Sequence, residues 1–483
     1  MGAGERFKKR LRDGRNVWIN GERVRDLVSH PAFSGTIESI ASLLDLQDHP
    51  DVRDELTFEI SNGNRANMAF LIPETKEDIF RRSRAFRLWS GATFGVMSRV
   101  AGYYRSQLVG WYVHRNIFEN EAPGFSDKMK RYFEWVREND LLLTAAGHDP
   151  QIDRSKTADE LGDLYTAARI VKETEDGIIV RGAKMIATGA PYMDEIMISS
   201  HKKREKKEKG FGSMFAINVN TPNVHLICRE SFASDNKEDH PLSSRFDEMD
   251  AVIVFDDALI PWERVFIKDD IETMWKIRND PFVTAISIHE TIVRLVSKLE
   301  FVAAIGNDLA ESIGITIYQH VQAKLAELFM QVETINALLL SAEHHSNKYD
   351  DVWAPSIDPM VTAKNLGMHY YPRAIEILQQ LSAAGMLQTP SSTAEFHSEI
   401  GEFVNKYYRG ADRNAEERVK LLKLAWDLVG SPLGSRHELY ERFYAGDSVR
   451  AFASQYLEYD KSNLIKRVQD RIKSKISSEL SFQ

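Results

Sequence analysis

The spacing of apolar residues changes twice along this chain of 483 residues, and these changes limit its fold more than any other feature. Between residues 75 and 137, "KEDIFRRSRAFRLWSGATFG" and "PGFSDKMKRYFEWVRENDLLL" carry apolar side chains at steps of three and four, which predicts helices. Residues 165–270 form short runs rich in β-branched and aromatic residues, which predict strands. Helical spacing returns after residue 275. The order helix, sheet, helix predicts an α+β fold.

Turn signals divide the central β-rich segment. "EDG" at residues 175–177 predicts a hairpin, and "VNTPNV" at residues 219–224 predicts a second one. A β-sandwich or barrel of about 110 residues fits this pattern. The run "KKREKKEKG" at residues 202–210 lies between two predicted strands. We expect a solvated hairpin tip there rather than a docking patch, because the run is short and its glutamates dilute its charge.

The C-terminal half of the chain predicts a helical bundle. Apolar residues step by four, three, four, three and four along one face of a long helix: Val321, Leu325, Leu328, Val332, Ile335 and Leu339. Further helical runs cover residues 359–384 and 412–429. Single cores stop growing at about 250 to 300 residues, so we expect several units. We predict an N-terminal mainly helical domain at 1–140, a central β-domain at 141–272 and a C-terminal helical bundle with a tail at 273–483.

Composition excludes several classes of protein. The net charge of −9 and the pI near 5.9 leave no overall electrostatic footprint for nucleic acid or for an anionic membrane. The one cysteine, Cys228, rules out a disulfide framework and a thiolate-bound metal cluster within one chain, and we expect no metal site. The first residues lack the apolar core of a secretory signal, and no stretch approaches the ~18 apolar residues of a membrane span. We therefore expect a soluble, cytoplasmic protein.

Several separated stretches, in the same order, resemble one enzyme family. They are "DGRNVWINGERVRDLVSHPAF", "DPQIDRS", "GAKMIATGA", "RFDEMDAVIVFDDALIPWERVF" and "AWDLVGSPLGSRHELYERFYAGD". Together they resemble the oxygenase component of 4-hydroxyphenylacetate 3-monooxygenase, a two-component flavin-dependent hydroxylase. The resemblance implies an acyl-CoA dehydrogenase-like fold, with an N-terminal helical domain, a central β-sandwich or barrel and a C-terminal helical bundle. In that fold the flavin lies between the β-domain and the bundle.

The resemblance also implies a reaction and partners. FADH2 comes from a separate flavin reductase, and no glycine-rich fingerprint for a nicotinamide cofactor follows any predicted strand here. O2 adds at C4a, and the hydroperoxyflavin transfers its distal oxygen to the carbon ortho to a phenolic hydroxyl, on a substrate like 4-hydroxyphenylacetate. Because bundle helices pair across subunits in this fold, and the helix near 316–345 carries more apolar surface than one neighbour covers, we expect a homotetramer or at least a dimer.

The resemblance places the flavin against three parts of the chain. Small residues allow the backbone to approach the ring, and polar residues can partner its pyrimidine edge. Taken alone, a loop such as "DPQIDRS" is more often a capped turn between helix and strand, and the alternative for Thr188 is a strand-end threonine packed by its methyl group. By resemblance, the flavin contacts are Ala145, Ala146, Gly147, Gln151, Ile152, Asp153, Arg154, Thr188, Gln388, Tyr444, Ala445 and Gly446.

Arg99 and Tyr103 align with the residues that contact the phenol in the family. Residues four apart on a helix lie on one face, and an arginine there stabilises a developing phenolate. Without the resemblance, Arg99 reads as a surface residue of an amphipathic helix. Ser200 and His201 align approximately with residues near the side chain of the substrate.

The chain departs from the family at the residue that helps to hold the phenol. The family has Thr-His-Ala where this chain has Thr144-Ala145-Ala146, so that histidine is missing. His148 is one candidate for its place, although a loop histidine that only forms hydrogen bonds is the alternative. His289 is a second candidate base, which we expect at the opening of a bundle helix. The alternative is a helix-terminal histidine satisfied by the backbone.

Other functions of the same fold are less consistent with the sequence. The 4-hydroxybutyryl-CoA dehydratases hold an iron–sulfur cluster with three cysteines and a histidine, which one cysteine cannot supply. An acyl-CoA dehydrogenase is disfavoured because "PWERVF" and "ERFYAGD" match the hydroxylases. A non-catalytic flavin-binding relative stays open, as does a hydroxylase specialised for a halophenol or a carrier-tethered tyrosine. That choice depends on loops around residues 200–215.

Overall fold

A computed structural model describes residues 1–61, 63–98, 102–120, 122–200, 203–208, 210–444 and 446–473. Its helices are α1 (Ala3–Arg10), α2 (Pro31–Asp45), α3 (Arg53–Leu56), α4 (Lys76–Ala92), α5 (Tyr103–Val113), α6 (Arg115–Glu119), α7 (Phe125–Glu138), α8 (Ser243–Phe246), α9 (Ile271–Arg278), α10 (Pro281–Ser312), α11 (Gln319–His344), α12 (Ile357–Ser382), α13 (Gly401–Tyr407), α14 (Ala415–Val429), α15 (Pro432–Phe443), α16 (Ser448–Glu458) and α17 (Ser462–Lys473). Its strands are β1 (Val17–Ile19), β2 (Glu22–Arg23), β3 (Thr57–Glu59), β4 (Arg65–Asn67), β5 (Leu143–Ala146), β6 (Arg169–Glu173), β7 (Gly177–Thr188), β8 (Glu195–Ile198), β9 (Met214–Asn218), β10 (Val224–Cys228), β11 (Asp250–Pro261), β12 (Val265–Ile267), β13 (Asn347–Tyr349) and β14 (Val352–Ala354).

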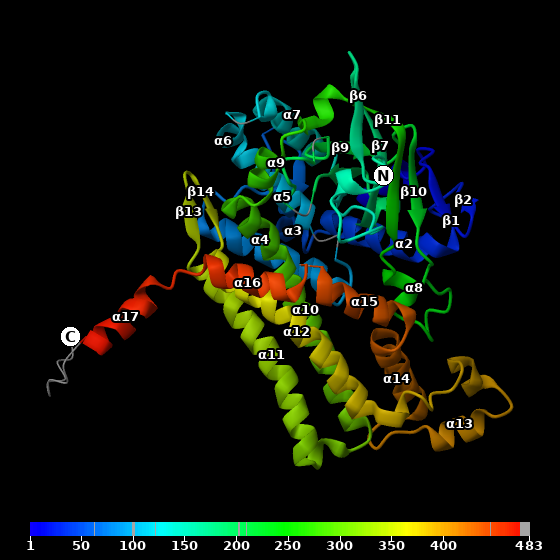
Figure 1. The fold of residues 1–483 in the computed structure, drawn as a ribbon. Coiled ribbons are helices and arrows are strands. Elements are labelled where there is room, and N and C mark those ends of the chain that lie inside the picture. Colours follow the sequence, from blue (N-terminus) through cyan, green and yellow to red (C-terminus); the bar gives the residue numbers. More distant parts are fainter. Residues whose placement is uncertain are drawn as a thin grey trace.

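Two sheets form the β-rich part of the molecule, at the opposite end from the tips of the long helices (Figure 1). One has the order β2-β1-β10-β11-β7-β6, and the other has the order β12-β9-β8-β5. The predicted turn at 175–177 joins β6 to β7 as an antiparallel pair, which confirms that hairpin. The second predicted hairpin is wrong, because β9 and β10 lie in different sheets. That turn instead carries the chain from one sheet to the other.

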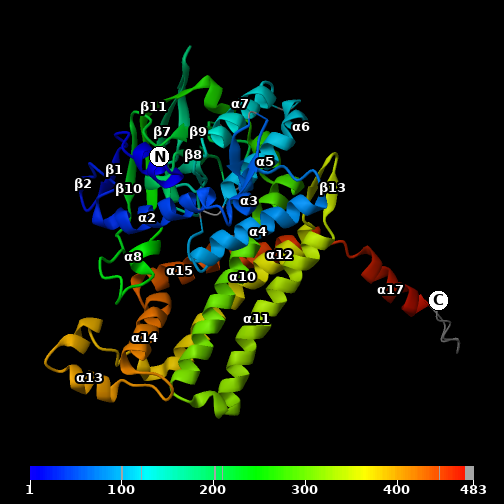
Figure 2. The same cartoon turned by 180° about the vertical axis from the view of Figure 1, so that it is seen from behind.

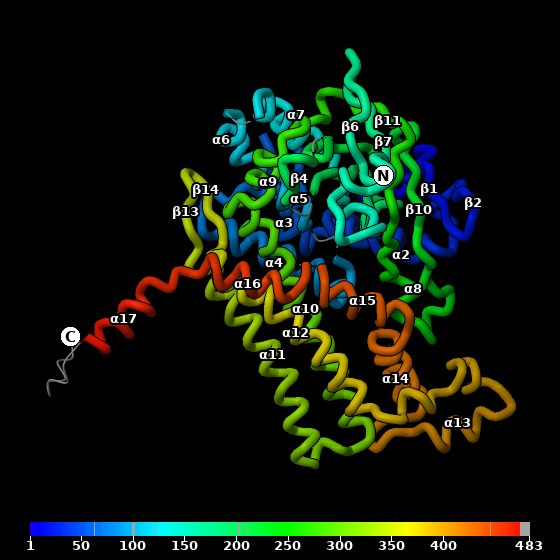
Figure 3. The backbone as a smooth tube through the Cα atoms, in the orientation of Figure 1, coloured from blue at the N-terminus to red at the C-terminus, as the bar shows by residue number. Residues whose placement is uncertain are grey.

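The first residues of the chain extend the larger sheet. β1 pairs in parallel with β10, with Val17 opposite Leu226, and β2 pairs with β1 at the outer edge (Figure 3). Val17 and Ile19 are buried. A segment of three residues gives too short an alternation to identify as a strand from sequence.

The bundle is built around α10, which packs against α11, α12, α4 and α5 (Figure 2). Asp280 caps its N-terminus by accepting a hydrogen bond from the Val283 N–H at 3.0 Å. The predicted long helix is confirmed as α11, with Val321, Leu325, Leu328, Ile335 and Leu339 buried. Among the described helices, α11 is also the one long and apolar enough to cross a membrane by length and composition. α17 projects away from the body (Figures 1 and 2).

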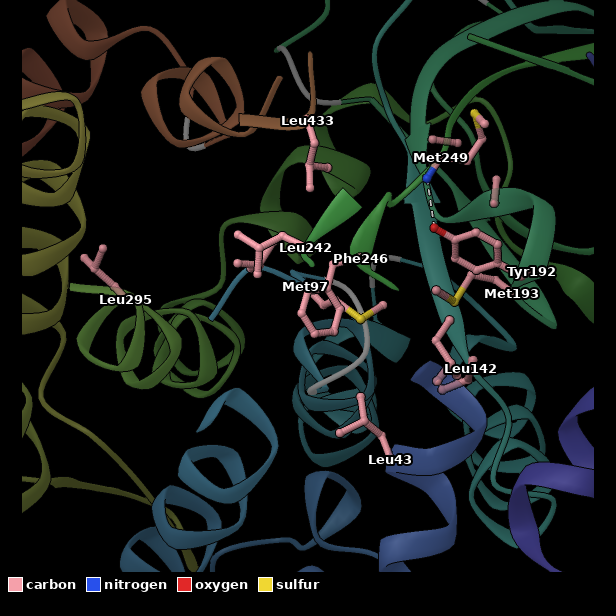
Figure 4. Packing of buried hydrophobic residues seen from close by; sticks show 14 of the residues in the cluster. Leu43, Met97, Leu142, Tyr192, Met193, Leu242, Phe246, Met249, Leu295 and Leu433 are labelled. Carbon is pink, nitrogen blue, oxygen red and sulfur yellow. Dashed lines mark hydrogen bonds between the residues drawn. The ribbon is translucent and has the colours of Figure 1, made fainter. Parts of the chain in front are cut away.

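One hydrophobic core continues from the large sheet into the bundle. Figure 4 shows Met97, Leu242, Phe246, Leu295 and Leu433, which come from separate elements of the two halves. In the same region the Tyr192 hydroxyl accepts a hydrogen bond from the Met249 N–H at 2.8 Å. Because this core is apolar and buried, it fixes the sheet ends against α10 and thereby positions the site described next.

Candidate active site

The end of β7 is held by hydrogen bonds to its neighbour β11 and to β5 of the other sheet. The Thr188 hydroxyl donates to Asp250 Oδ1 at 2.6 Å, and the Thr188 carbonyl accepts from the Thr144 hydroxyl at 2.8 Å. Thr144 and Thr188 are both buried. The predicted flavin residue Thr188 is therefore a fixed point at the strand end, with its hydroxyl hydrogen already directed to a carboxylate.

Asp250 is the centre of a charged network that sequence reasoning did not single out. Arg436 donates to both of its oxygens at 3.0 and 2.7 Å, and Arg229 donates to Oδ2 at 3.0 Å. Burial raises the pKa of the Asp250 carboxyl, but the charges and hydrogen bonds of Arg436 and Arg229 more than offset this effect and hold its pKa well below the usual range. The network ties the strand ends to α15, which carries Arg436.

α15 is also tied to α10, just before the predicted flavin contacts at 444–446. Glu441 accepts hydrogen bonds from Lys298 and, at 2.9 Å, from Arg294, and all three side chains are buried. The Tyr444 ring stacks on the Tyr440 ring with centroids 5.4 Å apart, and the Arg294 guanidinium carbon lies 5.9 Å from the centroid of the Tyr444 ring. The buried Tyr444 hydroxyl has no hydrogen-bond partner among the described residues. The ion pairs of Arg436 and Glu441 on α15 therefore fix the helix that ends just before Tyr444.

The predicted flavin loop runs alongside β7. Ala145, Ala146 and Gly147 are buried, and the Met185 N–H donates to the His148 carbonyl at 2.8 Å. Gln151 and Arg154 are exposed beyond that point, and Asp153 accepts from the Ser155 hydroxyl at 2.6 Å.

Two apolar side chains are exposed on this part of the chain. Ile152 is 70% exposed, and Ile186 is 52% exposed. Ile186 also has a φ of 59°, which is rare for a β-branched residue and marks local strain at the end of β7. On the other side, Gly446 has a φ of 97° and open space where a Cβ would stand. These features fit a flat, partly apolar ring with polar edges.

A buried cluster joins this loop to the segment before β9. Asp149 pairs with Lys184 at 2.9 Å and with Arg204 at 2.5 Å, and Arg204 also pairs with Glu208 at 2.9 Å. The side chains of Arg204 and Glu208 are 0% and 1% exposed. The prediction of a solvated tip at 202–210 is therefore wrong for these two residues, because the Asp149 carboxylate draws Arg204 inward. Lys203, Lys206 and Lys207 are exposed as predicted.

Two of the four predicted substrate residues, Tyr103 and Ser200, belong to the part of the chain that the structure describes. Arg99 and His201, like the predicted flavin contact Ala445, lie outside the described residues. Tyr103 is the first residue of α5 and is half-buried, with its ring edge-on to Tyr104 at 5.0 Å. Ser200 is fully buried two residues beyond the end of β8.

The chain packs on α10 both before and after Tyr103. A Cβ built on Gly95 would stand 2.7 Å from the Arg294 carbonyl oxygen, and one built on Gly110 would stand 2.8 Å from the Val283 Cα. These two contacts hold Gly95 and α5 against the α10 stretch from Val283 to Arg294, which contains His289.

His289 does not open its helix, since α10 begins at Pro281, and the prediction of a helix-terminal position is wrong. Its side chain is fully buried, with Nε2 at 2.9 Å from Glu343 Oε1 and its ring edge-on to Phe86 at 5.7 Å. Nδ1 is buried and has no hydrogen-bond partner within the described part of the chain. Sequence reasoning missed Glu343, which lies 54 residues away on α11.

The two remaining predicted residues lie in different surroundings. His148 is exposed, at the start of the flavin loop. Gln388 is exposed after α12. The end of α12 packs near Gly306 of α10, through Leu378 and Leu381. Gly306 stands about 18 Å along the helix from Arg294, so within one chain Gln388 is distant from Tyr444.

Two family profiles match the chain in succession. The profile described as "4-hydroxyphenylacetate 3-hydroxylase N terminal" matches residues 3–267, and "4-hydroxyphenylacetate 3-hydroxylase C terminal" matches residues 281–473. The chain belongs to this family. It is 36% identical over 468 residues to the 4-hydroxyphenylacetate 3-monooxygenase oxygenase component of Thermus thermophilus, covering 95% of each chain. Membership in this family confirms the prediction that the chain is a flavin-dependent aromatic monooxygenase of the oxygenase-component type.

Solved structures confirm the predicted fold. The oxygenase component of 4-hydroxyphenylacetate 3-monooxygenase, complexed with FAD and 4-hydroxyphenylacetate, superposes with a TM-score of 0.93 at 35% identity and 98% coverage of both chains. An archaeal 4-hydroxybutyryl-CoA dehydratase superposes with a TM-score of 0.86 at 19% identity, covering 100% of this chain and 97% of the other, which shows the fold alone.

Family members are named for different phenols. A Rhodococcus 4-nitrophenol 2-monooxygenase oxygenase component is 32% identical over 92% of this chain and 86% of its own. A Streptomyces globisporus monooxygenase, named for a 3-chloro-4-hydroxyphenyl group on a peptidyl-carrier protein, is 32% identical over 92% of this chain and 85% of its own. The family therefore does not fix the substrate.

Proposed function

We propose that the chain takes FADH2 from a separate flavin reductase and hydroxylates a phenol ortho to its hydroxyl group. One observation of the structure supports this proposal above the others. His289 is buried, its Nδ1 has no partner among the described residues, and it lies on the stretch of α10 against which Gly95 and α5 pack. A base in that position can take the proton of a phenolic hydroxyl.

The overall reaction consumes one phenol, one O2 and one FADH2, and it forms one catechol, one FAD and one water. Bound FADH2 supplies the electrons that activate O2. The residues of this chain bind and orient both molecules, move the phenolic proton and exclude water. Removal of the proton raises the electron density of the ortho carbon, which favours its attack on an electrophilic oxygen.

The flavin is proposed to lie between β7, the 145–154 loop and the 444–446 turn. The exposed Ile152, the open space at Gly446 and the unpartnered Tyr444 hydroxyl support this position. Gln388 fits only as a contact from a neighbouring subunit, because it is distant from Tyr444 in its own chain. The residues proposed to hold the flavin are Ala145, Ala146, Gly147, Gln151, Ile152, Asp153, Arg154, Thr188, Gln388, Tyr444, Ala445 and Gly446.

The phenol is proposed to lie between the start of α5 and the end of β8. Arg99 stabilises the phenolate, Tyr103 orients it, and Ser200 and His201 lie toward the rest of the substrate. His289 is preferred to His148 as the base that compensates for Ala145, because the His289 side chain is buried on α10 whereas His148 is exposed. A 4-hydroxyphenylacetate-like phenol is the proposed substrate class.

A panel of phenols tests this function. The panel contains 4-hydroxyphenylacetate, 4-nitrophenol, a halophenol and a carrier-tethered tyrosine, each given with chemically reduced FAD and O2. A product heavier by one oxygen supports the proposal and identifies the substrate class. FAD binding without oxygen insertion into any phenol points to a non-catalytic relative.

The proposal also covers the setting of the enzyme. We place it in the cytoplasm as a homotetramer, with a flavin reductase as partner and without nucleic-acid or membrane partners. The exposed Phe329, Met330 and Leu340 of α11 support assembly, because they leave an apolar face uncovered in one chain.

A further inference from the structure

We propose that Glu343 is the positioning residue that makes His289 a base directed at the phenol, and this rests on the proposed function. Nothing in the sequence connects the two residues, which belong to α10 and α11. The proposal follows from the burial of both side chains, from the hydrogen bond between Glu343 and His289 Nε2, and from the absence of a partner for His289 Nδ1 among the described residues.

The pair is shielded from water. His289 is 0% exposed and Glu343 is 2% exposed, and Nε2 lies 2.9 Å from Oε1. Burial raises the pKa of the Glu343 carboxyl, but the hydrogen bond and charge of His289, with smaller effects of Ser83 and Arg87, lower it below its usual range. Glu343 is therefore a carboxylate, which accepts hydrogen bonds and cannot donate one.

A carboxylate at Nε2 selects one tautomer of the imidazole. The proton of neutral His289 lies on Nε2, where it is donated to Glu343, so Nδ1 carries the lone pair. That lone pair has no donor among the described residues, although leaving a buried polar atom unsatisfied is destabilising. A phenolic hydroxyl is a donor of the required kind.

The ring is close to the segment that carries the predicted substrate residues. Phe86 packs edge-on against His289 with centroids 5.7 Å apart. The same Phe86 ring lies 3.4 Å from the Cβ position of Gly102, the residue before Tyr103. The Phe86 ring thus contacts both the His289 side chain and the residue just before the start of α5.

The proposed step is a proton transfer. The phenolic O–H bond breaks, an N–H bond forms at His289 Nδ1, and the electron pair stays on the phenolate oxygen. The charge of the resulting imidazolium is balanced by Glu343, which keeps its own charge throughout. The proton leaves later with the water formed in the overall reaction. Glu343 touches neither substrate nor flavin, so its effect passes through His289.

The test compares Glu343→Gln with the parent on a phenol that the parent accepts and on its ring-fluorinated analogues. Each fluorine acidifies the phenol, and an already ionised phenol needs no base. We expect Glu343→Gln to lower hydroxylation of the unfluorinated phenol by about 100-fold or more. The deficit should shrink to less than about threefold for the most acidic analogue, with FAD affinity unchanged.

A matched control is Glu327→Gln on the same helix, whose carboxylate pairs with Arg373 and is 38% exposed. It should behave as the parent with every analogue. Glu343→Asp, which keeps the charge, should recover part of the activity and replaces Glu343→Gln if that variant does not fold. Equal losses on all analogues, or no loss on any, would overturn the proposal.

A second measurement is independent of activity. Nitrogen NMR of the flavin-free protein labelled with ¹⁵N-histidine reports the tautomer of each ring, and His289→Gln assigns the signal. The proposal predicts the Nε2–H form in the parent and its loss in Glu343→Leu, which has no acceptor, whereas an Nδ1–H form in the parent overturns it. If the parent hydroxylates no phenol, the proposed function fails, and the tautomer still decides whether Glu343 orients His289.

Discussion

Replacing Asp250 with asparagine removes the charge from a carboxylate that accepts hydrogen bonds from Thr188, Arg229 and Arg436. The amide introduced by Asp250→Asn has one acceptor oxygen, and its NH2 group faces a guanidinium that can only donate. Both arginines remain where they are, with side-chain exposures of 20% and 12%. The change therefore leaves the partly buried Arg436 without its anion, whereas Arg229 keeps its ion pair with Asp247 at 2.6 Å.

The magnitude follows from this geometry. Breaking a buried ion pair costs about 3 to 5 kcal/mol, and partial exposure places Asp250→Asn near about 3 kcal/mol. At about 2.1 cal/mol/K per residue, a chain of 483 residues unfolds with an entropy of about 1 kcal/mol/K, so Tm falls by about 3 °C. FAD affinity should fall about tenfold, because the network positions both Thr188 and the turn after α15.

The pH dependence has a defined sign. The pKa of Asp250 is lowered in the folded state, so its stabilisation is complete above the ordinary carboxyl value of 3.8 and is lost as the pH falls. The difference in Tm between parent and Asp250→Asn should be constant near neutral pH and shrink below about pH 4.

Scanning calorimetry and a titration with oxidised FAD measure both effects. The matched control is Asp257→Asn on the same strand, which pairs with Arg181 at 2.5 Å but is 44% exposed, so its Tm should stay close to that of the parent. The reasoning is refuted if Asp250→Asn is as stable as this control and binds FAD as the parent does.

Further predictions concern the substrate side, the partner, the assembly and the second ion-pair cluster. Arg99→Ala should bind FADH2 normally but release hydrogen peroxide and form about 30 to 1000 times less hydroxylated product, whereas Arg154→Ala should weaken flavin binding itself. Stopped-flow kinetics with product analysis separates the two effects. Efficient hydroxylation by Arg99→Ala would contradict the proposed position of the substrate. With NADH and FAD alone the chain should show almost no turnover until a reductase is added, and rapid NADH oxidation by the chain alone contradicts the two-component assignment. Sedimentation should give a homotetramer or at least a dimer, and a monomer at micromolar concentration contradicts it. Asp149→Asn should speed amide hydrogen exchange at residues 203–208, because Arg204 loses its carboxylate, and unchanged exchange argues against that anchor.

Local patterns were sufficient to predict several of the longer helices, namely α4, α7, α11, α12 and α14. The apolar stripe that begins at Val321 predicts α11 because helix formation depends on residues three and four apart. The hairpin at 175–177 was predictable because its strands are adjacent in the chain. The hairpin at 219–224 was not, because the partner of each strand is chosen by distant segments, such as β1 for β10.

The site shows the same limit. The resemblance proposed Thr188 and His289, but the residues that position them lie far away in sequence. Asp250 and Arg436 are 186 residues apart, and His289 and Glu343 are 54 apart. Their pairing depends on how the bundle packs on the sheets, which no local spacing encodes. Arg204 was misread for the same reason, since a charged run is expected in water unless a buried partner such as Asp149 is known.

Oxygen insertion into a phenol is the central claim, and a single turnover under ¹⁸O2 tests it most directly. The flavin-loaded, chemically reduced protein is mixed with the preferred phenol and ¹⁸O2, and the product is analysed by mass spectrometry while hydrogen peroxide is quantified. The account predicts an ortho-dihydroxy product that carries one ¹⁸O atom, with little peroxide. Unlabelled product, or complete conversion of O2 to peroxide with the phenol unchanged, would contradict it.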